Sequence, residues 1–209
     1  MTLMSNQQTL ILDIETVGED YDSLDKATQE SLTRWIKKES GSEEEYKIAL
    51  EDLKTGLGFS PLTGSIAAIG ILDYHKNEGA VYFQAPGAQY EEIKEDGFLF
   101  KAMEEKEMLE KFWEVARKCQ VFVTFNGRTF DMPFLFIRSA IHGIRPSKDL
   151  MRGRYLYQHN PDALHIDLLE QFTFYGLVRR KGSLHLWARA FGIESPKAAG
   201  VTGDDVGPL

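Results

Sequence analysis

The chain has one cysteine, Cys119, among its 209 residues. A single thiol excludes an internal disulfide and fits the reducing cytoplasm, where we expect the protein to be found. We expect Cys119 to be a small buried hydrophobic residue near a helix end. Long apolar runs are also missing, so the sequence predicts no membrane span, and no signal-peptide pattern opens the chain.

Positive charge is in short supply, with 24 Lys and Arg against 32 Asp and Glu and a net charge of −8. This balance argues against strong non-specific binding to nucleic acid by phosphate neutralisation. It does not exclude a nuclease, because bound cations change the charge of a site. The length and the hydrophobic content of 43% suit one folded domain over residues 1–209.

The most informative segment is the tetrapeptide D-I-E-T at positions 13–16, which closes a short apolar run. Residues two apart on a strand face the same side, so we expect Asp13 and Glu15 to project together from a buried strand over about 9–14. Two inward carboxylates repel each other and are costly to desolvate, and a divalent cation offsets both costs. Carboxylate ligands suit Mg²⁺ or Mn²⁺ rather than zinc. The alternative is a strand end whose acids reach solvent.

A second constellation follows the apolar run 121–125, which predicts another strand. Asn126-Gly127 breaks that run, and apolar residues then recur at helical spacing as far as Ile141. Asp131 falls in the first turn of this helix. It is either an acid stabilised by the helix dipole or a third metal ligand beside the strand of Asp13.

Together, D-I-E-T and N-G-x-x-F-D-x-P resemble the first two motifs of the DEDD 3′–5′ exonucleases. The resemblance is greatest to the proofreading exonuclease domain of family B DNA polymerases and its stand-alone bacterial relatives. Residues 61–84 also look like the strand pair that follows the first motif. The resemblance implies an α/β, RNase H-like fold, in which helices flank a mixed β-sheet.

The same resemblance implies hydrolysis of single-stranded or frayed DNA or RNA from the 3′ end, with two Mg²⁺ or Mn²⁺ ions. In the implied mechanism Asp13 bridges both ions, while Glu15 and Asp131 hold one each. The substrate contacts expected from the motifs are Thr16, Asn126 and Phe130. Phe130 could stack on a 3′-terminal base, although core packing explains it equally well.

The family's fourth carboxylate belongs to a third motif, Y-x-x-x-D or H-x-x-x-x-D, and neither pattern occurs after Asp167. Residues 200–206 resemble the loop that precedes that motif, and Asp204 and Asp205 within them are weak candidates for the missing acid. Three alternatives stay open: a truncated polypeptide, a substitute ligand, or a catalytically impaired module that binds nucleic acid or a protein. Asp167 is the first candidate substitute, and the favoured alternative is that it caps the helix that follows.

Residues 20–57 form an insertion after the first strand, with helical character over about 23–53 and a break at Gly41-Ser42. We expect a helical hairpin packed on the sheet. The alternatives are a lid, a dimer contact or a surface for a protein partner.

The rest of the chain predicts strands at 65–74 and 80–83 and a helix that includes residues 108–116. A strand-to-helix turn is expected at 164–169, and Ser183 is expected to cap a helix through Ala190. Basic residues gather at Arg152 and Arg154 and again at 179–181. Each group could hold backbone phosphates or be ordinary solvated charge.

Overall fold

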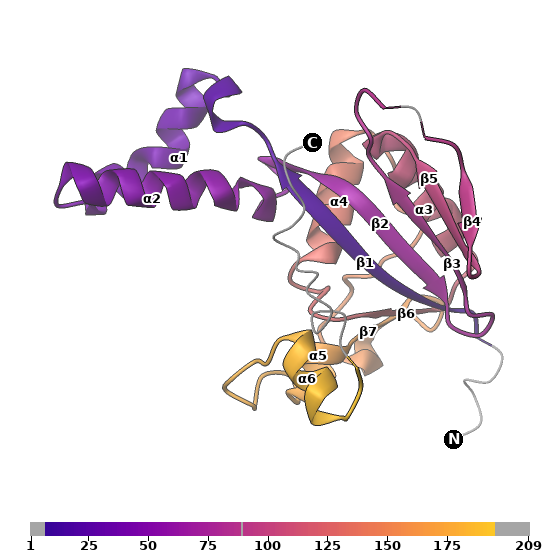
Figure 1. The fold of residues 1–209 in the computed structure, drawn as a ribbon. Coiled ribbons are helices and arrows are strands. Elements are labelled where there is room, and N and C mark those ends of the chain that lie inside the picture. Colours follow the sequence, from indigo (N-terminus) through magenta and orange to yellow (C-terminus); the bar gives the residue numbers. More distant parts are fainter. Residues whose placement is uncertain (1–6, 89, 195–209) are drawn as a thin grey trace.

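The computed structural model describes residues 7–88 and 90–194, which form a mixed seven-stranded sheet in the order β4-β5-β3-β2-β1-β6-β7 (Figure 1). The β1, β2 and β3 strands are antiparallel, β5 is parallel to β3, and β6 and β7 are parallel to β1. The strands are β1 (Thr9–Gly18), β2 (Gly64–Asp73), β3 (Glu78–Phe83), β4 (Ile93–Glu95), β5 (Phe98–Ala102), β6 (Val121–Thr124) and β7 (Leu164–Asp167).

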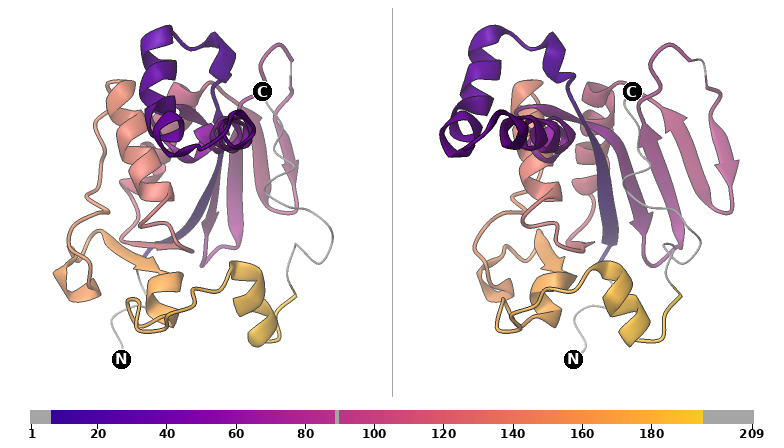
Figure 2. Two further views of the ribbon diagram at one scale, coloured as in Figure 1. Left: turned by 90° about the vertical axis from the view of Figure 1, so that its left-hand side faces the viewer. Right: turned by 60° about the vertical axis from the view of Figure 1, so that its left-hand side comes forward.

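Two helices, α3 (Glu105–Ala116) and α4 (Asp131–Ile141), cover one face of this sheet (Figure 2). A hydrogen bond of 2.8 Å from Trp113 Nε1 to Ser139 Oγ joins them. The β1 strand turns Leu10, Leu12 and Ile14 into the core that these helices complete. The alternate residues of β1 therefore point to the opposite face, which α3 and α4 leave uncovered.

The insertion after β1 consists of α1 (Lys26–Glu39) and α2 (Glu43–Gly56), which project away from the sheet in Figure 1. Asp25 caps α1, and Ser42 caps α2 by accepting a hydrogen bond from the backbone of Glu45. The predicted insertion and its break at Gly41-Ser42 are confirmed, but the expectation that the helical hairpin packs on the sheet is wrong, because α1 and α2 extend away from it. The short turns η1 (Tyr21–Ser23) and η2 (Leu57–Phe59) join the insertion to the strands.

Two small helices follow β7, namely α5 (Leu168–Phe172) and α6 (Leu184–Ala190), and the turn η3 (Leu156–Gln158) precedes it. Ser183 caps α6 as predicted, because its Oγ accepts a hydrogen bond from Leu186 N–H at 3.4 Å. Cys119 is buried, also as predicted. In residues 7–88 and 90–194, none of the helices is both long and apolar enough to cross a bilayer.

Two features differ from the sequence prediction. The β1 strand continues past position 14 to Gly18, because its pairing with β2 resumes after a register shift at Glu15/Thr16 and runs on to Gly64. The β4–β5 hairpin was not predicted. Its turn is Asp96-Gly97, both with positive φ, and Asp-Gly between two strands is a recognised hairpin signal that could have revealed it.

The α/β class, the mixed sheet flanked by helices and the helical insertion are thus confirmed. That residues 1–209 make a single domain, with 20–57 as one unit inside it, stays a prediction.

Candidate active site

The sheet brings Asp13 and Asp131 together although they are far apart in the sequence. The parallel pairing of β1 with β6 aligns Ile11 with Val123, so the chain leaves β6 beside the middle of β1. Helix α4 then begins at Asp131, whose Oδ1 accepts a hydrogen bond of 3.1 Å from the backbone N–H of Ile14. The carboxyl groups of Asp13 and Asp131 lie close enough to affect each other's pKa.

This pair of acids has unusual electrostatics. Burial first, and then the negative charge of Asp13, raise the pKa of Asp131 to about 7. Burial also raises the pKa of Asp13, while its hydrogen bond with Asp131 lowers it. Asp13 as a whole residue is exposed, so solvent still reaches part of this pair. Two shielded acids in contact favour sharing a proton unless a cation neutralises them.

Glu15 lies two residues farther along the same face of β1, opposite Ala68 of β2. The expectation that Asp13 and Glu15 point into a buried interior is wrong, because both are exposed while Leu12 and Ile14 fill the core. Within the part of the chain that the structure describes, no group of three or more His, Cys, Asp or Glu side chains is arranged to hold a metal. Asp13 and Asp131 supply the hard oxygen donors that Mg²⁺ and Mn²⁺ prefer, so this pair fits such an ion.

The expected substrate contacts all lie close to these acids along the chain. Thr16 Oγ1 donates to the carbonyl of Gly58 at 2.7 Å and so fastens the end of the insertion to β1. Asn126 has a positive φ of 65°, and its Oδ1 accepts from Thr129 Oγ1 at 2.8 Å. The Thr16 hydroxyl and the Asn126 amide oxygen therefore have structural partners already.

Phe130 is half-buried, and its ring contacts Phe59 at 6.4 Å and Phe134 at 5.2 Å between centroids. Phe59 belongs to η2 at the end of the insertion. No pattern in the sequence indicates this contact, because only the return of the insertion to the sheet creates it.

Asp167 has a structural role, as the capping alternative predicts. Its Oδ1 accepts from the backbone of Leu169 at 2.9 Å, which caps α5, and also from that of Asn126 at 2.9 Å. Its Oδ2 accepts from Arg128 N–H at 3.0 Å. The buried side chain thus holds the loop before Asp131 in place.

The neighbouring His165 is buried between Thr124 and Leu150, to which its two ring nitrogens are bonded at 2.9 and 3.2 Å. Burial lowers the pKa of His165 to about 4, so the ring is neutral at physiological pH. The weaker candidates Asp204 and Asp205, and the loop at 200–206, lie outside the described residues.

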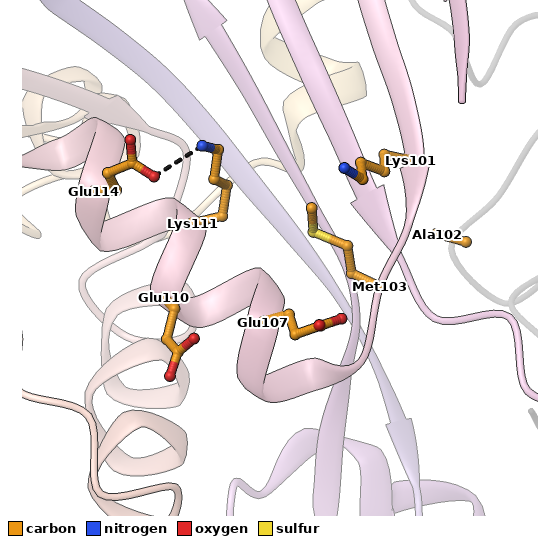
Figure 3. Close-up of a pocket in the computed structure, with 7 residues that line it drawn as sticks. All are labelled: Lys101, Ala102, Met103, Glu107, Glu110, Lys111 and Glu114. Atoms are coloured by element: carbon orange, nitrogen blue, oxygen red, sulfur yellow. Dashed lines mark hydrogen bonds and ion pairs between the residues drawn. The ribbon is translucent and has the colours of Figure 1, made fainter. Parts of the chain in front are cut away.

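A hollow of about 320 Å³ between α3 and β5 lies away from these acids (Figure 3). Its charged groups come mainly from one exposed face of α3. Lys111 pairs with Glu114 at 2.8 Å, and Glu107 bonds the backbone N–H of Glu104. Three of the five charged side chains that line the hollow thus have partners, and we assign no chemistry to it.

Known proteins resemble the chain in both fold and sequence. The family B DNA polymerase from the hyperthermophilic archaeon Pyrobaculum calidifontis superposes with a TM-score of 0.50 at 16% identity, over 96% of this chain and 20% of that one. At this identity the likeness shows the fold alone. A DNA polymerase of Methanocaldococcus jannaschii is 38% identical over 72 residues, which is 31% of this chain and 4% of the polymerase.

The chain therefore spans only a small part of the polymerases that it matches. The family model described as a predicted 3'-5' exonuclease related to the exonuclease domain of PolB matches residues 85–209, more than half of the chain. The resemblance read from the two motifs is confirmed, and the chain belongs to this family of predicted 3'-5' exonucleases.

Proposed function

We propose that the chain is a metal-dependent 3′–5′ exonuclease that removes nucleotides from single-stranded or frayed DNA or RNA. The contact between Asp13 and Asp131 carries this proposal. Each acid belongs to one of the two motifs. Burial and the charge of Asp13 disfavour ionisation of Asp131, and a bound cation would offset both effects. Membership of the exonuclease family supports the same reaction.

In this proposal Asp13, Glu15 and Asp131 are the catalytic carboxylates and the metal ligands. Two Mg²⁺ or Mn²⁺ ions are expected, or a single ion if no fourth carboxylate completes the set. When bound, the metal would supply Lewis-acid chemistry by stabilising negative charge on the reacting phosphate oxygens.

The protein's own contribution is to hold these acids in position. Ile14 N–H orients the Asp131 carboxylate, and Asp167 fixes the loop that leads to it. We propose Thr16, Asn126 and Phe130 as substrate contacts. The Thr16 hydroxyl keeps acceptor capacity while it donates to Gly58, and the Phe130 ring offers an apolar surface to a terminal base.

The test is degradation of a 5′-labelled single strand with Mg²⁺ or Mn²⁺. We expect stepwise shortening from the 3′ end, no shortening of a strand whose 3′ end is blocked, and loss of activity in Asp13→Asn and Asp131→Asn. The matched control is Asp52→Asn, because Asp52 is an exposed acid of the insertion, and this variant should keep full activity. Cleavage that begins internally, or that survives both substitutions, would contradict the proposal.

A binding module of the same fold without catalysis is the second candidate. It is favoured by the lack of a three-ligand cluster among the described residues and by the structural use of Asp167. Such a module would bind the labelled strand without shortening it at any metal concentration. A protein partner for the insertion stays a prediction.

A further inference from the structure

Exposed tyrosines gather next to α5, on two segments that we call the aromatic–basic surface, residues 152–158 and 174–181. The rings of Tyr155 and Tyr157 are stacked, with centroids 5.7 Å apart and planes 3° apart. The ring of Tyr175, from the second segment, meets Tyr155 edge-on at 4.8 Å. Tyr157 is 82% exposed, so the outer face of this stack is open to a ligand.

Backbone hydrogen bonds fix the first segment. Gln158 Oε1 accepts from the N–H groups of Arg154 at 2.8 Å and Tyr155 at 3.0 Å. Arg154 Nη2 donates to the carbonyl of Tyr175 at 2.7 Å and so ties the first segment to the second. The tyrosines are thus presented from a braced loop, which lowers the entropy lost when a ligand binds.

The second segment contains two consecutive residues with strained backbone conformations. Phe174 and Tyr175 have positive φ values of 51° and 58°, which residues other than glycine rarely adopt. A hydrogen bond of 2.7 Å from Tyr175 N–H to the carbonyl of Glu170 holds this conformation. Phe174 is 67% exposed, and residues with such strained backbone cluster at functional sites.

The charge of the surface is opposite to that of the chain. Its cations are Arg152, Arg154, Arg179, Arg180 and Lys181, all exposed, whereas the chain carries a net charge of −8. Neither segment contains an Asp or a Glu. A polyanion would therefore be attracted to this part of an otherwise acidic molecule.

One acid, Glu170, links this surface to the loop of the second motif. Its two oxygens lie 3.1 Å from Arg154 Nε and 3.4 Å from Arg128 Nε. Arg128 belongs to the loop that leads to Asp131, and Asp167 binds its backbone. Ion pairs and a hydrogen bond therefore connect the aromatic–basic surface to the loop that leads to Asp131.

We propose that this surface binds the body of a single-stranded nucleic acid whose 3′ end lies at Asp13 and Asp131. Unpaired bases would stack on Tyr157 and Phe174, while the cations neutralise the phosphates between them. Paired bases do not expose their faces, so a duplex would lack the stacking contacts. The direction of the strand rests on the proposed nuclease function, but the binding itself does not.

The test is fluorescence anisotropy of a labelled single strand of roughly 16 nucleotides, the upper end of known single-strand site sizes, with the full chain in EDTA. Tyr157→Ala should weaken binding about tenfold, since one base–aromatic stack has about that effect. Tyr157→Phe keeps the ring and should bind like the wild type. Replacing Arg179 and Arg180 with Ala should weaken binding and reduce its salt dependence.

Matched controls separate these effects from general loss of a ring or of charge. Tyr74→Ala removes a tyrosine that is 63% exposed elsewhere on the molecule and should leave binding unchanged. Replacing the exposed pair Lys37 and Lys38 of α1 with Ala should affect binding less than replacing Arg179 and Arg180. Binding of either a DNA or an RNA strand supports the proposal, and the tighter one identifies the preferred sugar.

The proposal is overturned if Tyr157→Ala binds as tightly as Tyr74→Ala, or if an abasic strand or a duplex binds as tightly as the single strand. Tighter binding of polyglutamate would assign the surface to acidic peptides instead. Because EDTA removes the metal, binding is measured without turnover. If the exonuclease proposal fails, Tyr157→Ala should still weaken binding. If the binding proposal fails, the strand should still be shortened when metal is present.

Discussion

Asp131 accepts a hydrogen bond from the backbone N–H of Ile14 at 3.1 Å, so the second motif is fastened directly to the strand of the first. The bond places a buried carboxylate against Asp13. The contact joins the first turn of a helix to the middle of a strand, and it forms only when the sheet is assembled.

The first prediction concerns pH. The pKa of Asp131 is raised to about 7 from 3.8, so in EDTA the folded state holds a proton that the unfolded state has released. Stability from this group is present below pH 4 and is lost as pH rises towards 7, by on the order of a few kcal/mol. Denaturant titrations at a series of pH values should show this loss for the wild type and not for Asp131→Asn. If the stability of Asp131→Asn falls with rising pH as steeply as that of the wild type, another group is responsible.

The second prediction concerns metal ligands. A metal that binds only the folded state increases the free energy of unfolding, by about 2.7 kcal/mol when its concentration is about a hundred times Kd. The melting temperature rises accordingly. Mn²⁺ should therefore shift the melting temperature of the wild type at matched ionic strength, and Asp13→Ala should remove the shift. Glu15→Gln should reduce it if Glu15 is the third ligand. An equal shift in Glu15→Gln and in Asp52→Asn would exclude Glu15 from the set.

The third prediction separates structure from ligation at Asp167. Asn alone would cap α5 nearly as well as Asp, but here both carboxylate oxygens accept backbone hydrogen bonds. Asp167→Asn loses one of these acceptors, so it should destabilise the protein by about 1–3 kcal/mol in EDTA. The additional stability that Mn²⁺ confers should be the same as in the wild type. A selective loss of the Mn²⁺ effect, with normal stability in EDTA, would instead make Asp167 a metal ligand.

The fourth prediction concerns the loop between β6 and α4. A Cβ at Gly127 would lie 2.3 Å from Thr124 Oγ1, an atom that bonds His165 at 2.9 Å inside the sheet. Gly127→Ala should therefore destabilise the fold by about 1–3 kcal/mol, the usual cost of overpacking. Gly56→Ala, at the end of α2 with nothing within 4 Å of the added atom, should be neutral or stabilising by up to about 1 kcal/mol. Equal effects of the two substitutions in chemical denaturation would contradict this account.

The sequence by itself determined the features that depend on neighbouring residues. Alternation along β1 put Asp13 and Glu15 on one face, although that face is exposed and not buried as predicted. Ser42 and Ser183 set where two helices begin. The two short motifs also indicated the exonuclease family, which a match to residues 85–209 bears out. These signals are readable because strand periodicity and helix capping act over only a few residues.

Only the tertiary structure decided which distant groups meet. It placed Asp131 against Asp13, bonded both oxygens of Asp167 to backbone groups, and joined Arg154 to Tyr175. Local pattern does not determine such contacts, because they depend on the order and register of strands that are far apart in the chain. The pKa of Asp131 follows from the same cause, since desolvation and the charge of Asp13 arise only once the sheet has formed.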